Sequence, residues 1–131
     1  MRRVVITGLG ALTPIGENID SFWDGLKKGK SGAAPITKFN TDKFKATFAC
    51  ELKDYNPIDH FDRKEVRKYD PFSQYALVST DQAVKDAGLN FEELDRTRAG
   101  VIWGSGIGGM ETFFNESADF AKGSGRPRFN P

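Results

Sequence analysis

The sequence holds one cysteine and one histidine among 131 residues. One thiol cannot close an intrachain disulfide, and no Cys/His/Asp spacing resembles a metal site, so we expect no disulfide, metal or cofactor. The 19 basic and 18 acidic residues leave a formal charge of +1, without the strongly basic face that nucleic-acid binding needs. Apolar runs are far shorter than the ~20 residues of a membrane-spanning helix, and the N-terminus lacks the apolar region of a secretory signal. We therefore expect a cytoplasmic protein that binds neither nucleic acid nor membrane.

Glycine is the residue type in excess. The chain has the length of one domain and an ordinary apolar fraction of 38%, but glycine accounts for 14 of its 131 residues. The glycines gather in two clusters, within 8–16 and 104–109. Each cluster follows a short β-branched run, at the point where a strand would pass into a loop or a helix.

Three segments have the composition of strands. Arg3–Thr7 and Ala99–Trp103 are continuously apolar, which is typical of strands buried on both faces of a sheet. A third, short strand is predicted near Thr47–Leu52. Strands that alternate with helices predict an α/β fold. Three strands make a thin sheet, however, so we expect part of a larger enzyme or a chain that completes itself against another one.

Three segments have helical periodicity. The first carries apolar residues at i, i+3, i+4 and i+7, starts at Asn18 or Asp20 and ends at Gly29. The second begins at Asp70 with proline in the first helical position, and ends at Gly88. Its small residues predict a central, buried helix that another element approaches closely; they are Ala76, Ser79, Ala83 and Ala87. The third runs from near Gly109 to Lys122 and Gly123.

The second glycine cluster allows two readings. Gly104, Gly106 and Gly109 match the dinucleotide-binding fingerprint, after a predicted strand and before a predicted helix. The fingerprint also requires an acidic residue at the end of a second strand, ~20 positions further on, and neither is present. A tight turn at which backbones crowd together is therefore favoured over a phosphate site.

Neither Cys50 nor His60 has the surroundings of a catalytic group. An activated thiolate needs a helix N-terminus or a nearby cation, whereas Cys50 lies in a predicted strand next to Glu51. We expect Cys50 to be buried as a small apolar residue. We expect His60 to be a surface or capping residue, because no partner for catalysis or ligation can be identified.

Residues 63–68 form the one concentrated positive patch, with four cations and one acid. A charge run is most often a solvated face, but such a cluster is also suited to an acidic partner. Lys64, Arg67 and Lys68 stand at i, i+3 and i+4, so they share one face if this segment is helical.

Several strings, in this order, resemble the β-ketoacyl-acyl-carrier-protein synthase family, and most closely its synthase II branch. They cover essentially the whole chain and are Arg2–Gly10, Thr13–Gly16, Phe22-Trp23, Ser31-Gly32, Arg63–Asp70 and Gly104–Gly109. The resemblance implies a thiolase-like fold, with two related α/β halves, each a mixed sheet with covering helices. Residues 1–131 would be the N-terminal portion of the family's N-terminal domain, and part of the first half.

The resemblance also implies a function. Family members are usually homodimers that condense a carrier-bound acyl chain with malonyl-acyl carrier protein, releasing carbon dioxide in fatty-acid synthesis. Their nucleophilic cysteine and two catalytic histidines match no position in this sequence, so we expect the chain alone to be inactive. Ile107 matches the isoleucine that gates the acyl pocket. The cations expected to dock the carrier protein are Lys64, Arg67, Lys68, Arg126 and Arg128.

Two further hypotheses stay open from the residues alone. The first is a nucleotide- or phosphate-binding α/β module that uses the two glycine clusters. The second is a protein that occurs naturally as these 131 residues and acts only as an interaction domain. A cysteine flanked by small residues after residue 131, followed by two histidines, would establish the condensing enzyme over these alternatives.

Overall fold

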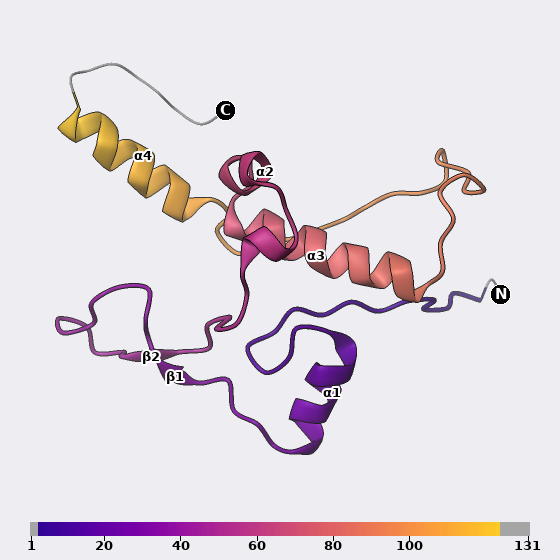
Figure 1. Cartoon of the computed structure of the whole chain (residues 1–131), viewed down its shortest axis with the longest axis horizontal. Helices are drawn as coiled ribbons and strands as arrows, with labels where there is room; N and C mark the ends of the chain where they lie inside the picture. The colour runs from indigo at the N-terminus through magenta and orange to yellow at the C-terminus, as the bar shows by residue number, and fades with distance from the viewer. Residues whose placement is uncertain (1–2, 124–131) are drawn as a thin grey trace. The chain divides into compact units, whose positions relative to one another are not determined.

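The computed structural model describes residues 3–123 of the chain. Its elements in order are α1 (Ile19–Lys27), β1 (Ala34–Pro35), β2 (Phe48–Ala49), the 3-10 turn η1 (Pro57–Asp59), α2 (Arg63–Lys68), α3 (Pro71–Asp86) and α4 (Met110–Lys122) (Figure 1). The chain divides into two compact units. The first comprises residues up to Tyr55 and Val78–Leu94, and the second comprises Asn56–Leu77 and residues from Asp95 onward.

Helix α1 forms where the sequence predicts it. The Asn18 side chain accepts a hydrogen bond from the Ser21 N–H at 2.9 Å, and the Ser21 hydroxyl accepts one from the Asn18 N–H at 3.2 Å. This reciprocal pair is a capping box, which satisfies two backbone donors that the first turn leaves open. The helix ends at Gly29, whose φ of +62° is a conformation that favours glycine.

Helix α3 is also confirmed at both ends. The Asp70 carbonyl accepts a bond from the Gln74 N–H at 3.0 Å, and Gly88 closes the helix with φ of +61°. Two of its residues, Gln74 and Val78, are the most buried polar and apolar side chains, with exposed fractions of 4% and 6%. Among the described residues, Val78 is the one buried large apolar side chain, so this helix carries what core there is.

The small face of α3 is closely approached by another segment, as predicted, and that segment is the first glycine cluster. The expectation that the helix is buried holds only for Gln74 and Val78. A Cβ atom at Gly10 would lie 2.9 Å from the Ala83 nitrogen, and one at Gly8 would lie 2.7 Å from the Ala87 Cβ. Two side chains of α3 hold this segment by its backbone. Leu9 N–H donates to Asp86 at 2.8 Å and Ala11 N–H donates to Gln82 at 3.0 Å.

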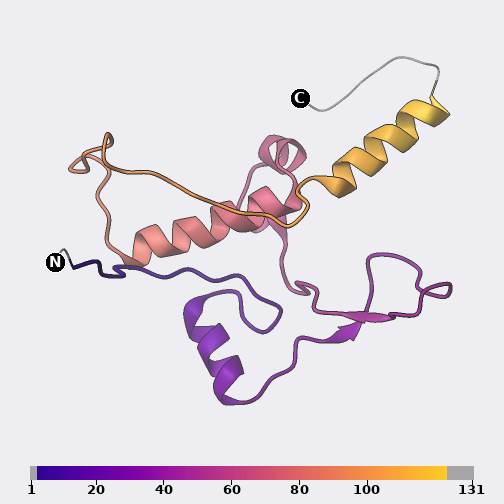
Figure 2. The same ribbon diagram turned by 180° about the vertical axis from the view of Figure 1, so that it is seen from behind.

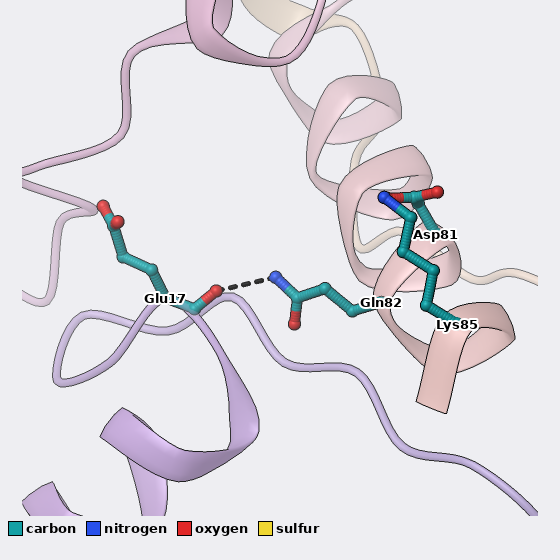
Figure 3. Close-up of polar contacts among 4 residues, drawn as sticks. All are labelled: Glu17, Asp81, Gln82 and Lys85. Carbon is teal, nitrogen blue, oxygen red and sulfur yellow. Dashed lines mark hydrogen bonds and ion pairs between the residues drawn. The ribbon is translucent and has the colours of Figure 1, made fainter. Parts of the chain in front are cut away.

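Gln82 reaches a second point of the first unit. Its side-chain amide donates to the Glu17 carbonyl at 2.7 Å, directly before α1 (Figure 3). One glutamine therefore ties α3 both to the N-terminal segment and to the start of α1. Next to it on the same helix, Lys85 pairs with Asp81 at 2.7 Å, an exposed i, i+4 pair that contributes little to stability (Figure 3).

Two of the three strand predictions are wrong for the described residues. Arg3–Thr7 and Ala99–Trp103 carry no strand, and Val4 and Ile102 are 93% and 100% exposed. A strand is defined by backbone hydrogen bonds to a neighbour, and these two segments have no such ladder here. The mixed sheet implied by the resemblance is reduced, within residues 3–123, to a two-stranded antiparallel pair.

Strand β2 of this pair lies within the third predicted strand, whereas β1 forms in a segment for which no strand was predicted. Ala49 of β2 stands opposite Ala34 of β1, and Phe48 stands opposite Pro35. Helix α4 follows its prediction and ends before Gly123, whose N–H donates to the Asp119 carbonyl at 2.8 Å. Within residues 3–123, no helix combines the length and apolar character needed to cross a membrane.

Candidate functional site

Helix α2 presents the positive patch predicted from the sequence. It spans Arg63–Lys68, and its three predicted docking cations are exposed; they are Lys64, Arg67 and Lys68. Because the segment is helical, residues at i, i+3 and i+4 lie along one side of it. The Lys68 ammonium also lies 5.6 Å from the centre of the Tyr69 ring, within the range of a cation–π contact.

A capping box fixes the start of this short helix. The Asp62 carboxylate accepts bonds from the backbone N–H groups of Lys64 and Glu65 at 2.7 and 2.8 Å. The Glu65 carboxylate accepts the Asp62 N–H at 3.2 Å in return. Sequence reasoning missed this feature, although an acid at 62 followed by glutamate three residues later is its known signal. The one acid of the patch, Glu65, and the preceding Asp62 are thereby both bonded to the backbone.

A buried amide fixes the end of α2. Gln74 of α3 donates from its side chain to the Tyr69 carbonyl at 2.8 Å and to the Val66 carbonyl at 3.2 Å. These carbonyls belong to the last turn of α2 and the residue after it, which have no partner further along the helix. Gln74 therefore ties the end of the cationic helix to α3 within the second unit. Sequence analysis gave Gln74 no role, because its neighbours in space are not its neighbours in the helical pattern.

Ile107 lies in an open glycine-rich segment of the second unit. Its side chain is 78% exposed, and Cβ atoms built at Gly104 and Gly106 would meet nothing within 4 Å. Gly108 has φ of +77°, and its N–H donates to the Ser105 hydroxyl at 3.1 Å. The strand that the dinucleotide fingerprint requires before these glycines is not formed. The structure thus offers the phosphate-site hypothesis no support.

The remaining candidates divide as follows. Cys50 is exposed, so the prediction of a buried thiol is wrong: β2 ends at Ala49, and nothing covers the next residue. His60 is confirmed as a capping residue, because its N–H closes η1 on the Pro57 carbonyl at 3.1 Å. Arg126 and Arg128 lie outside the described residues. Within 3–123, no group of three or more His, Cys, Asp or Glu side chains is placed to hold a metal ion.

The first unit contains a cavity that the sequence did not predict. Its volume is about 290 Å³, and its wall is formed by the loop before α1, the first turn of α1 and residues from two later loops. None of the residues predicted for docking or gating lines it. The lining residues are Thr13, Pro14, Ile15, Gly16, Glu17, Asn18, Ser21, Lys30, Leu52, Lys53 and Asp54.

Comparison with known proteins agrees with the resemblance seen in the sequence. The family model described as "Beta-ketoacyl synthase, N-terminal domain" matches residues 1–129. The 3-oxoacyl-[acyl-carrier-protein] synthase 2 of Staphylococcus aureus (strain COL) is 50% identical over 112 residues, which are 86% of this chain and 27% of that protein. The enzyme of the same name from Coxiella burnetii (strain RSA 493 / Nine Mile phase I) is 42% identical over 130 residues, 99% of this chain and 31% of the relative.

A solved structure confirms the predicted fold class. The ishigamide ketosynthase/chain length factor matches with a TM-score of 0.82 at 33% identity, over 95% of this chain and 31% of that one. The chain therefore spans about a third or less of the length of the proteins that it matches. Because the family model covers all but its last residues, the chain belongs to the β-ketoacyl synthase family.

Proposed function

We propose that this chain is the N-terminal portion of a 3-oxoacyl-acyl-carrier-protein synthase of fatty-acid synthesis. The observation that carries the proposal is the 50% identity to the synthase 2 enzyme over 86% of the chain. In the reaction, an acyl group passes from its carrier thioester to an enzyme cysteine. Malonyl-acyl carrier protein then loses carbon dioxide, and its α-carbon displaces the cysteine sulfur to form the new carbon–carbon bond.

The nucleophile and its histidines are supplied outside residues 1–131. Covalent catalysis needs a nucleophile with an activating neighbour. Cys50 stands exposed at the end of β2 and His60 ends a 3-10 turn, and neither matches a motif position of the family. On this proposal residues 1–131 alone are inactive, and the active protein is a homodimer in the cytoplasm.

The part of the function that these residues carry is recognition. Acyl carrier protein is the partner that the relatives' name specifies. It is an acidic protein, and α2 offers it exposed cations on one side: Lys64, Arg67 and Lys68. Exposed contacts of this kind contribute ~0.2–1 kcal/mol each, but they accelerate encounter and weaken as salt rises. Arg126 and Arg128 extend this proposed docking set.

Charge reversal tests the proposal in the protein at its natural length. Lys64→Glu with Arg67→Glu should lower kcat/KM for carrier-bound acyl and malonyl substrates several-fold. The difference from wild type should shrink as salt shortens the ~8 Å Debye length. Condensation of a small acyl thioester without the carrier should be nearly unchanged, because reversal on α2 does not alter the nucleophile.

A matched control separates docking from general charge effects. Lys43→Glu with Lys45→Glu makes the same change in charge at two exposed lysines far from α2 in sequence, and should leave carrier-dependent turnover intact. Equal losses with carrier-bound and carrier-free substrates would show that docking is not the role of α2. Failure of the wild-type protein to form a 3-oxoacyl product would overturn the enzyme assignment itself.

A further inference from the structure

Helix α4 begins without a capping side chain of its own. Its N-cap residue is Gly109, and no side-chain bond from that residue reaches the first turn. The N-terminal end of a helix leaves backbone N–H groups open and carries partial positive charge. Serine, threonine, aspartate or asparagine commonly satisfies it, and glycine supplies no such group.

An aspartate that directly precedes another helix stands at this end instead. Thr112, in the first turn of α4, donates its hydroxyl hydrogen bond to the Asp70 carboxylate. A Cβ atom at Gly109 would lie 3.0 Å from the Asp70 Cγ, so the carboxyl group occupies the space that a side chain at the N-cap would fill. Figure 2 shows α4 starting beside the first turn of α3, and Asp70 directly precedes that turn in the sequence. The absent side chain at 109 and the carboxylate at 70 are complementary.

The contact lies two residues after Ile107. Beyond this point, towards the N-terminus, the segment is open: Gly104 and Gly106 have no neighbours within 4 Å of a built Cβ. Between them and α4, the described bond from Gly108 N–H to the Ser105 hydroxyl is local to the segment. The Asp70 contact is therefore the place where the segment that carries Ile107 is joined to another helix.

We propose that Asp70 is a positioning residue: its carboxylate holds the first turn of α4 through the Thr112 hydroxyl and so fixes the C-terminal end of the Gly104–Gly109 segment. The proposal rests on the function proposed above where it concerns the acyl chain, because Ile107 acts there as the gate. An anchored segment holds Ile107 in one position. Loss of the anchor lets the side chain move away, so acyl chains of different lengths are distinguished less sharply.

The first measurement is amide hydrogen exchange in the protein at its natural length. Asp70→Ala and Thr112→Val should speed exchange at residues 106–112 at least fivefold. Asp70→Asn, which keeps an acceptor for Thr112, should change it less. Asn18→Ala is the matched control, because it removes the cap of α1 in the first unit and should leave these amides unchanged. If Asp70→Ala does not fold, Thr112→Val alone decides. Unchanged exchange in a folded Thr112→Val protein would overturn the proposal.

The second measurement is the ratio of kcat/KM for a long and a short acyl thioester. Asp70→Ala and Thr112→Val should move this ratio when residue 107 is isoleucine, and move it much less in an Ile107→Ala background. Such coupling is the expected signature of a residue that acts through another one. An equal effect in both backgrounds would show that Asp70 does not act through Ile107, and would overturn the proposal.

The two measurements also test the anchoring by Asp70 independently of the gating role proposed for Ile107. If Ile107→Phe leaves the ratio unchanged while Thr112→Val still speeds exchange at 106–112, the gate proposed for Ile107 is wrong and the anchoring by Asp70 is supported. If Ile107→Phe shifts the ratio while the Asp70 and Thr112 variants leave both ratio and exchange unchanged, the gate is supported and the anchoring is wrong.

Discussion

At position 107, an isoleucine with most of its surface exposed stands in a segment of glycines that no neighbour confines. On the proposed function this side chain closes a narrow apolar channel. Ile107→Phe in the protein at its natural length should shorten the acyl chains accepted, because the ring occupies more of the channel. The check is kcat/KM across a series of acyl thioesters. An active Ile107→Phe protein with the wild-type length preference would contradict the gate.

Glu51 shows how one threonine changes an exposed carboxyl group. The Thr37 hydroxyl and N–H donate to its side chain at 2.8 and 3.0 Å, and these bonds lower the pKa of Glu51 below its usual value of 4.5. Since the folded pKa is the lower one, the stabilisation is present above the usual pKa and is lost as the pH falls through the folded pKa.

Thr37→Val should therefore raise the pKa of Glu51 towards its usual value, as followed by an NMR titration of the carboxyl carbon. The chain contains a matched pair, because Thr97 donates in the same way to Asp95 and lowers the pKa of that group. Thr97→Val should raise the pKa of Asp95 towards its usual value and leave the pKa of Glu51 unchanged. A Glu51 titration that is identical in wild type and Thr37→Val would show that the bond does not persist in solution.

At the scale of elements, α3 holds its neighbours with two glutamines, one in each unit. Gln74→Leu removes the amide that bonds the Val66 and Tyr69 carbonyls, and should cost about 1–3 kcal/mol of unfolding free energy. Exchange protection should fall in α2 and the residue after it. Gln82→Leu is the control, and should instead expose the Ala11 N–H. Loss of protection at the same amides in both variants would contradict separate roles.

The close approach of Gly10 to α3 gives a second prediction at this scale. A methyl group there would press on backbone atoms of Ser79 and Ala83, which cannot rotate away. Gly10→Ala should therefore destabilise the protein by about 1–3 kcal/mol, as found for overpacked interiors. Gly100→Ala is the control, since a Cβ there meets nothing within 4 Å. Equal midpoints of denaturant unfolding for the two variants would contradict the close approach.

These elements also show what the sequence alone can predict. The ends of α1 and α3 were predictable because Asn18, Pro71, Gly29 and Gly88 act within their own helix or at its boundary. The strands predicted at 3–7 and 99–103 do not form, because a β-branched run becomes a strand only beside a hydrogen-bonding neighbour, and the sequence does not show whether one is present. Cys50 was predicted to be buried because it was assigned to a strand, but that strand ends at Ala49 and Cys50 is exposed.

The candidate site divides in the same way. The cations of α2 could be read from the sequence, because a charge run needs no partner to be recognised. The bonds of Gln74 to the end of α2, and of Asp70 to the start of α4, join residues that no periodicity relates. Only the fold brings these groups together. The supporting residues Gln74 and Asp70 were therefore harder to predict than the exposed cations of α2.

At the scale of the whole molecule, apolar side chains stand open in both units. They include Val4 and Ile6 in the first unit, and Ile102 and Phe113 in the second. Exposed apolar patches promote association. Residues 1–131 produced alone should therefore bind a hydrophobic dye and associate as concentration rises. Val4→Lys with Ile102→Lys should reduce both effects. A sharply melting monomer that binds no dye would contradict this prediction.

The position of Cys50 sets a limit on how such chains can be joined covalently. It is the sole thiol of the sequence, and it is exposed at the end of β2. Each chain can therefore form one intermolecular disulfide and no more. Under oxidising conditions the covalent product should stop at a pair of chains, twice 14.5 kDa, however large the apolar assemblies become. A non-reducing gel should show this one additional band, and Cys50→Ser should remove it; a ladder of higher bands would mean that another kind of cross-link forms.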